Sequence, residues 1–195
     1  PEEAGGAGAT AVEAVTALEV LGRHAVPGPV VESVMVAPRI AAALGGDSDS
    51  GDVAGELAGG ALASVAAPQI SPLAPDAHVA QYLWVVADDE VFTGTPGESR
   101  RSVDRARTVT TPTRGGRAAA HSTVALVNHG ALGTAAQLMG LGRAMLDMSV
   151  DYAGQRKQYG KLIGEYQALK HKLAEVAIAL EMARPLLWAG ALAIA

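Results

Sequence analysis

The segment from 151 to 175, DYAGQRKQYGKLIGEYQALKHKLAE, constrains the fold more than any other part of the chain. Apolar residues recur at steps of three and four on both sides of it, and residues with this spacing share one face of a helix. We therefore predict that one helix ends here, that the chain turns through Tyr159-Gly160-Lys161, and that a second helix begins at about Gly164. Helices joined by so short a loop pack antiparallel, which would bury both apolar faces and leave the loop at the rim. The expected buried residues are Leu138, Leu141, Met145, Met148 and Tyr152, then Leu169, Leu173, Val176, Leu180, Ala183 and Leu187.

The first 60 residues predict two helices followed by a loop. Thr10 and Glu13 have the spacing of a capping box, so a helix is expected from about Ala11 to His24, with Val15, Leu18 and Leu21 facing inward. A second helix is expected over about 30–44. The glycine-rich, acidic residues 45–60 predict a loop with one short helical turn.

Short apolar runs between turn residues replace the helical pattern from Gly60 to His121. These runs are rich in Val and Thr and are separated by Pro and Gly, which is typical of strands. We predict a small antiparallel β-domain, in which Asp76, Asp88 and Asp89 fall in turns. In the following long helix, the small residues Ala136, Gly140 and Ala144 would permit close approach of another helix.

Composition bounds the function more weakly. A net charge of -5 argues against nucleic acid, and the absence of cysteine excludes disulfides and thiolate chemistry. The apolar segment after Pro185 is too short to span a bilayer, so we expect a cytoplasmic protein without a membrane span. The first residue is Pro1 and the last is Ala195, within an apolar helical pattern, so we expect a piece of a longer protein.

A metal site is not expected. The carboxylates Asp47, Asp49 and Asp52 invite comparison with a calcium-binding loop. Counting from Asp47, however, places Ala58 at the twelfth position, where that loop needs a carboxylate.

The run Tyr152-x-x-x-Arg156-x-x-Tyr159-Gly160-Lys161, followed by Gln167-Ala168, resembles the C-terminal helical domain of acyl-CoA dehydrogenases. The usual family form is Tyr-x-x-x-Arg-x-x-Phe-Gly-Lys, then Gln-Ala. The N-terminal Pro-Glu-Glu-x-Gly-Gly-x-Gly, the Leu-Gly-Arg at 21–23 and the following Pro-x-Pro turn are also similar to this family. The resemblance implies an α+β fold with three parts: helical residues 1–59, a shortened middle β-domain at 60–121, and the first two helices of the C-terminal bundle at 122–195.

The resemblance also implies a cofactor and roles for site residues. In this family the arginine at the position of Arg156 reaches the FAD pyrophosphate of a neighbouring subunit. The aromatic residue at the position of Tyr159 packs near the adenine, and the glutamine at the position of Gln167 approaches the same FAD. Gly160 completes the loop. From spacing alone, Arg156 would instead only complement the dipole at a helix end, and Gln167 would only be a polar first-turn residue.

The catalytic base is not identified by the sequence. In most of the family it is a glutamate in the C-terminal part, beyond Ala195, and in a minority it stands near 128–131, where this chain has Asn-His-Gly-Ala. His129 is interpreted as a solvated or capping residue rather than a base. A run of arginines is interpreted as a charged strand edge, with binding of coenzyme A phosphates as the alternative. The run comprises Arg100, Arg101, Arg105, Arg107, Arg114 and Arg117.

The resemblance thus implies an oxidoreductase of lipid metabolism: a flavoprotein subunit that performs α,β-dehydrogenation of an acyl-CoA and passes electrons to an electron-transfer flavoprotein. It also implies a homo- or hetero-oligomer that assembles through the helical domain. Two alternatives stay open. One is a non-catalytic partner subunit that contributes Arg156 to a neighbour's FAD site, because much of the flavin-contacting segment is missing here. The other is a non-enzymatic helical assembly module.

Overall fold

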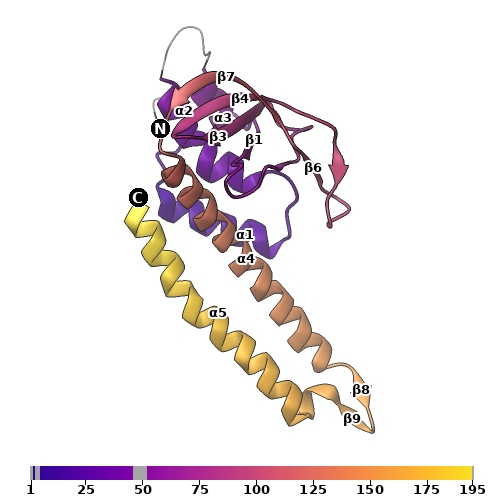
Figure 1. Cartoon of the computed structure of the whole chain (residues 1–195). Coiled ribbons are helices and arrows are strands. Elements are labelled where there is room, and N and C mark those ends of the chain that lie inside the picture. Colours follow the sequence, from indigo (N-terminus) through magenta and orange to yellow (C-terminus); the bar gives the residue numbers. More distant parts are fainter. Residues whose placement is uncertain (1, 3–4, 46–51, 195) are drawn as a thin grey trace.

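The computed structural model describes residues 2, 5–45 and 52–194, and it has an α+β fold. A body of short helices and strands carries two long antiparallel helices, which project from it and are joined at their far end by a small hairpin (Figure 1). Asp47 and Asp49, considered above for a calcium loop, lie outside the described residues.

The N-terminal helices follow the sequence prediction closely. Helix α1 spans Ala11–Arg23, and the predicted capping box is present, because Val12 donates its backbone N–H to Thr10 Oγ1 and Thr10 donates its own to Glu13. Val15 and Leu18 are fully buried and Leu21 is half-buried, as expected. The short helix α3, Val53–Ala58, is capped by Asp52 and supplies the expected turn.

The second helical stretch has an irregularity that the sequence prediction missed. It begins at residue 30, widens into the π-helical segment η2, Glu32–Val36, and continues as α2, Ala37–Leu44. Pro38 has no N–H to donate to the carbonyl four residues earlier, so the regular ladder is interrupted just before it. Ala37 instead donates to the carbonyl of Glu32, five residues back.

The β-region contains two small sheets. The first has the strand order β1-β3-β4-β7, and the second has the order β2-β6-β5. Strands β3 and β4 are joined by Asp88 and Asp89, both at positive φ, which forms the expected turn. The bounds are Ala63–Ala66 for β1, Ala74–Pro75 for β2, Tyr82–Ala87 for β3, Glu90–Thr95 for β4, Arg100–Arg101 for β5, Thr108–Thr110 for β6 and Thr113–Ala120 for β7.

One strand pair departs from the antiparallel prediction. Strands β1 and β3 run parallel, with Ala63 opposite Tyr82 and Ala66 opposite Val85. The connection between them is a crossover that places β2 in the other sheet, rather than a hairpin. Alternation of apolar residues marks strands but does not fix their direction, so the sequence pattern could not distinguish the two pairings.

The long helices are α4, Thr123–Ala153, and α5, Gln167–Ile194. Residues 129–133, HGALG, lie within α4. Between the helices lie strands β8, Lys157–Gln158, and β9, Lys161–Leu162, and the 3₁₀ turn η3, Ile163–Glu165. The antiparallel pairing is as predicted, although the second helix begins at Gln167 rather than at about Gly164.

The predicted buried face of α4 is wrong. Leu138, Met145, Met148 and Tyr152 are between 56% and 71% exposed. Close packing selects the small-residue face instead: a Cβ on Gly140 would lie 2.7 Å from the backbone nitrogen of Arg23 in α1. Three large side chains of the predicted face, Met145, Met148 and Tyr152, are therefore left exposed on the distal half of α4. On α5, Val176 is also 47% exposed, whereas Leu187 is buried as predicted.

The larger of two hydrophobic clusters among the described residues joins the N-terminal helices, the β-region and the long helices. It contains Leu18 of α1, Ile40 of α2, Val86 of β3, Leu126 of α4 and Leu187 of α5. The body is therefore stabilised by contacts between segments far apart in the sequence, and the distal halves of α4 and α5 extend beyond it (Figure 1).

Helix α5 is long and apolar enough, by length and composition alone, to cross a membrane, and 11% of its most apolar window is buried. The sequence argument against a span counted only the segment after Pro185. The helix runs through Pro185 without a break, so that length argument does not hold. Apolar helices that pack against other protein share this length and composition.

Candidate functional site

The hairpin between α4 and α5 has a defined backbone geometry. Tyr159 and Gly160 form its two-residue turn, both at positive φ, 50° and 81°. Lys157 pairs with Leu162, and the N–H of Ile163 donates to the carbonyl of Arg156. Tyr166 donates its hydroxyl to the carbonyl of Gln158 at 3.1 Å, and the Lys161 ammonium lies 4.1 Å from the centre of the Tyr166 ring. The hairpin is thus held in one shape by local contacts.

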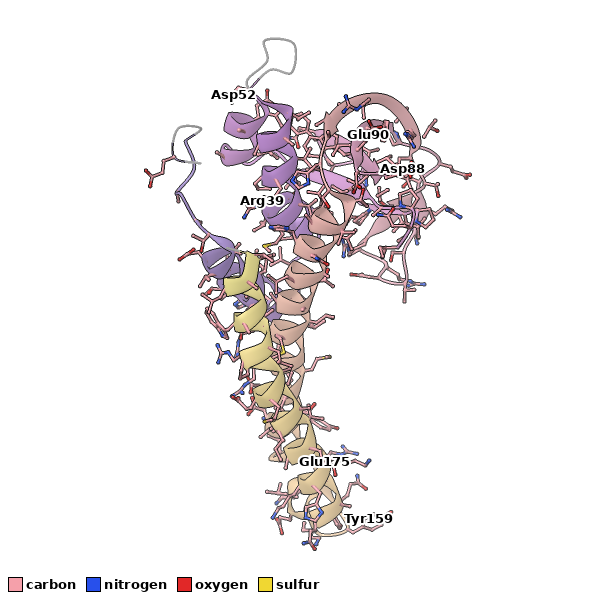
Figure 2. All side chains as sticks on the ribbon, turned by 60° about the vertical axis from the view of Figure 1, so that its left-hand side comes forward. Arg39, Asp52, Asp88, Glu90, Tyr159 and Glu175 are labelled. Carbon is pink, nitrogen blue, oxygen red and sulfur yellow. The ribbon has the colours of Figure 1, made fainter. Side chains whose placement is uncertain are left out.

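Tyr159 occupies the most exposed position of this hairpin. Its side chain is 93% exposed, and Figure 2 shows it at the far tip of the molecule. A tyrosine at positive φ costs stability, of the order of 1 kcal/mol, which glycine or asparagine would avoid. An aromatic ring in a strained, solvent-exposed position gains nothing for the isolated chain. Its placement therefore favours contact with a ligand or another subunit.

Arg156 is likewise directed outward. It is exposed and forms no ion pair or side-chain hydrogen bond with the residues that the structure describes. Two arginines of the body differ from it, since Arg107 and Arg117 are each paired with a carboxylate. A free guanidinium beside an exposed aromatic ring suits a phosphate-bearing aromatic ligand such as a dinucleotide.

Gln167 and Gly160 complete the set of predicted site residues. Gln167 is the first residue of α5 and is exposed, and a Cβ on Gly160 would meet nothing within 4 Å. The structure therefore places all four predicted residues at one end of the helix pair. They face solvent, and in the isolated chain they enclose no cavity.

A pocket that the sequence analysis missed lies in the body. It has a volume of about 690 Å³ and lies between η2, the two sheets and the first half of α4. Its walls are almost entirely apolar, and Glu32, Ser71 and Thr134 are the polar residues among them. Apolar walls include Val36, Val65, Ile70, Val86, Val109, Leu126 and Leu138. A pocket of this size and polarity suits an apolar small molecule.

Glu32 is the one ionisable residue that lines this pocket among the residues described. Burial raises the pKa of its carboxyl above the ordinary value, and this effect exceeds the opposing influence of its own backbone N–H and of Arg107. The hydroxyls of Ser71 and Thr134 already have local partners, since Ser71 accepts from the N–H of Leu73 and Thr134 donates to the carbonyl of Gly130. A glutamate within the mostly apolar run 30–36 is the sequence signal that could have identified this site.

Glu32 lies in a π-helical segment that is tied to a sheet, and an ion pair acts on it electrostatically. The hydroxyl of the next residue, Ser33, accepts from the N–H of Ala63 at 3.0 Å, which ties η2 to β1. On the other side, Arg107 Nε lies 2.8 Å from Asp76 Oδ2, and Arg107 Nη2 donates to the carbonyl of Gly28 at 2.9 Å. Asp76 also accepts the N–H of Thr108. This network joins the second sheet to the N-terminal part beside the pocket.

His129 is not a solvated residue, so that interpretation was wrong. It is 9% exposed on the buried face of α4, where Nδ1 lies 2.8 Å from the carbonyl oxygen of Ala125, and Nε2 is buried without a partner. Burial follows from the close packing of α4 against the N-terminal helices, which the sequence pattern did not predict. His129 does not line the pocket, so it has no access to a ligand there.

The arginine run largely has the predicted structural role. Arg107, Arg114 and Arg117 pair with acidic residues, and Arg114 also lies over the ring of Phe92. Strands β5 and β7, which carry most of the run, are edge strands of their sheets. Charged edges of this kind discourage pairing with other chains.

The hairpin and the pocket lie at opposite ends of α4. The pocket reaches Leu138, and the helix continues to Ala153, so 15 residues at 1.5 Å each separate them by about 22 Å. The hairpin also points away from the body (Figure 1). The two features of one chain therefore do not form one compact site.

Comparisons with known proteins identify the chain's relatives. Residues 115–195 match the profile described as "Acyl-CoA dehydrogenase, C-terminal domain". Over 188 residues the chain is 29% identical to acyl-CoA dehydrogenase IpdE2 of Mycolicibacterium smegmatis, covering 94% of this chain and 58% of that protein. The chain thus spans little more than half the length of that relative.

Solved structures share the fold. One is the ChsE4-ChsE5 complex from Mycobacterium tuberculosis, with a TM-score of 0.79 and 22% identity, covering 96% of this chain and 62% of the other. Another is butyryl-CoA dehydrogenase from Megasphaera elsdenii, with a TM-score of 0.75 and 17% identity, covering 98% and 66%. Residues 115–195 thus belong to the C-terminal domain of the acyl-CoA dehydrogenase family, and the chain as a whole is similar in sequence and fold to members of that family.

Proposed function

We propose that this chain is a subunit of an FAD-dependent acyl-CoA dehydrogenase and that its α4–α5 hairpin binds the FAD of a neighbouring subunit. The observation that carries the proposal is the exposed pair Arg156 and Tyr159 on a rigid, projecting hairpin within the family-matching region. Both residues stand where the family motif has its flavin-contacting arginine and aromatic residue.

The residues fit the dinucleotide chemically. Arg156 has the planar donor geometry to bind two pyrophosphate oxygens, and the Tyr159 ring offers a flat surface to the adenine. Gln167 supplies an amide at the start of α5, and Gly160 keeps the turn open. FAD, when bound, supplies the hydride acceptor for α,β-dehydrogenation. The contribution of this chain at the hairpin is to bind and orient.

The body pocket is the proposed site of the acyl group. Its apolar walls exclude water and favour an alkyl or alicyclic chain over a charged one. The pocket and the hairpin are about 22 Å apart along α4. The hairpin therefore binds an FAD that does not lie wholly against the pocket of the same chain. An oligomer through the helical domain, with the exposed apolar side of α4 covered, follows from this proposal.

A non-catalytic partner role is the second candidate function, and a specific observation favours it. The part of the pocket wall contributed by α4 contains no carboxylate, and His129 is buried outside the pocket. In that case the chain lends its hairpin to a catalytic subunit in a hetero-oligomer. The ChsE4-ChsE5 structure, which shares this fold, is named as a complex of two proteins.

Other parts of the proposal rest on the family. We infer an acyl-CoA substrate, an electron-transfer flavoprotein as electron acceptor, a role in lipid metabolism and a cytoplasmic location without a membrane span. The proposed division of the chain stays at residues 1–59, 60–121 and 122–195.

Flavin content tests the proposal directly. Arg156→Ala in the assembled protein is expected to weaken FAD binding about 10- to 100-fold, the effect of losing a charge-assisted contact. Lys170→Ala, an exposed cation in the first turns of α5, is the matched control and should leave binding unchanged. The readouts are the flavin absorbance of the purified protein and the Kd from titration of the stripped protein with FAD. Equal Kd values for Arg156→Ala and wild type would refute the role of the hairpin.

The two candidate functions are separated by purifying the chain alone and with its partners. A chain that alone holds one FAD per protomer and reduces an electron-accepting dye with an acyl-CoA is catalytic. A colourless chain that raises the flavin content of another subunit is the non-catalytic partner.

A further inference from the structure

We infer that Glu32 is the polar anchor of the body pocket and that the pocket takes an acyl group carrying an uncharged oxygen, a ketone or hydroxyl, within an otherwise apolar frame. This inference rests on the proposed function, which makes the pocket the acyl site. It goes beyond that function by naming the substrate class and the residue that selects it.

The first argument is the composition of the wall. A pocket for a plain alkyl chain has no use for a carboxyl group, and desolvating one is costly. Glu32 nevertheless lines this pocket, beside Val31 and Val36. No other residue among those described forms a hydrogen bond with its carboxyl. The carboxyl is therefore available to a ligand.

The second argument concerns which ligand group it would bind. Burial raises the pKa of this carboxyl, so the protonated form, which donates a hydrogen bond to a ketone or hydroxyl oxygen, is more favoured here than in a solvated glutamate. The Arg107 guanidinium, held by Asp76, acts on the same carboxyl and would repel a ligand cation. An anionic group on the ligand would meet an apolar wall and a carboxyl. An uncharged oxygen is the substituent that fits these surroundings.

The third argument is the local backbone. Glu32 opens the π-helical segment, and such segments in helices are frequent at functional sites. Ser33 ties the segment to β1, so the backbone beside Glu32 is held by the fold. Pro38 prevents a regular helix in this segment. The irregular turn places Glu32 in the apolar wall of the pocket.

A matched pair of probes tests the inference: cyclohexanecarboxyl-CoA and 4-oxocyclohexanecarboxyl-CoA, titrated calorimetrically into the assembled protein. The wild type is expected to bind the oxo thioester about tenfold more tightly, the worth of one net hydrogen bond. Glu32→Leu should abolish or reverse this preference. Thr134→Val, which alters another polar residue of the wall, should keep it.

The pH dependence provides a second test that does not need a folded Glu32→Leu variant. The oxo preference of the wild type should fall as pH rises through the pKa of Glu32, and Glu32→Gln should show no such fall. Asp76 and Arg107 are the charged groups beside Glu32, and both are present in every variant.

Equal affinity of the wild type for both thioesters, or an unchanged oxo preference in Glu32→Leu, would overturn the role of Glu32 and leave the proposed function intact. Failure of the wild type to bind either thioester would instead count against the pocket as the acyl site, and therefore against the proposed function as well.

Discussion

The close approach of α1 and α4 makes a sharp prediction about two glycines of the same helix. A Cβ added to Gly140 would lie 2.7 Å from the backbone nitrogen of Arg23 and 2.8 Å from the carbonyl carbon of Glu19, and closer still to the Glu19 oxygen. A Cβ added to Gly130 would meet only a methyl group of Val36, at 3.6 Å. Ordinary carbon contacts are about 3.5–4.0 Å, so only the first substitution forces movement.

The expected free energies follow from these distances. Glycine to alanine within a helix gains about 1 kcal/mol of propensity at either position. At Gly140 the neighbours are backbone atoms of α1, so the two helices must separate by about 1 Å, and overpacking of this kind costs about 3 kcal/mol. The net prediction is a loss of about 2 kcal/mol for Gly140→Ala and a gain of up to about 1 kcal/mol for Gly130→Ala.

Thermal and urea unfolding of the two variants measure this difference. For a chain of this size 1 kcal/mol shifts Tm by about 2–4 °C, so Gly140→Ala should lower Tm by about 4–8 °C and Gly130→Ala should raise it by about 2–4 °C. Equal shifts for both variants would refute the reasoning, because helix propensity alone would then account for the data and the helices would not be in contact at Gly140.

The remaining predictions concern single side chains. Because the pKa of Glu32 is raised in the native state, its contribution to stability is fully present below its ordinary value of 4.5 and is lost as pH rises through the native pKa. Urea unfolding from pH 4 to 8 should therefore show wild type losing stability relative to Glu32→Gln, and parallel curves would contradict the burial of this carboxyl. His129→Leu removes a buried, unpartnered ring nitrogen and should raise the free energy of unfolding by about 1 kcal/mol; marked destabilisation would mean that Nε2 has a partner. Thr10→Ala should cost about 1 kcal/mol through loss of the α1 cap, whereas Thr16→Ala, an exposed position within the same helix, should cost less.

Local signals in the sequence were reliable where the physics is local. Thr10 and Glu13 start α1 because a capping box satisfies backbone groups within four residues. Asp88 and Asp89 make the β3–β4 turn because they tolerate positive φ. The hairpin at Tyr159-Gly160 was likewise placed correctly.

Signals that depend on which face meets which partner were not reliable. The large apolar residues of α4 predicted a buried face, yet Met145 and Met148 are exposed. The small residues of the other face allow backbone contact with α1, which large side chains prevent. The same packing buried His129, and the parallel pairing of β1 and β3 arose from a crossover that alternation cannot reveal.

The sequence by itself determined the helix starts, the turns and the motif around Arg156, because each depends on residues a few positions apart. Only the tertiary structure decided that Glu32 lines an apolar pocket and that Arg156 lies about 22 Å along α4 from it. The physical reason is that the pocket wall is assembled from η2, two sheets and α4, whose lining residues run from Val31 to Leu138. No spacing within one segment records how distant segments meet.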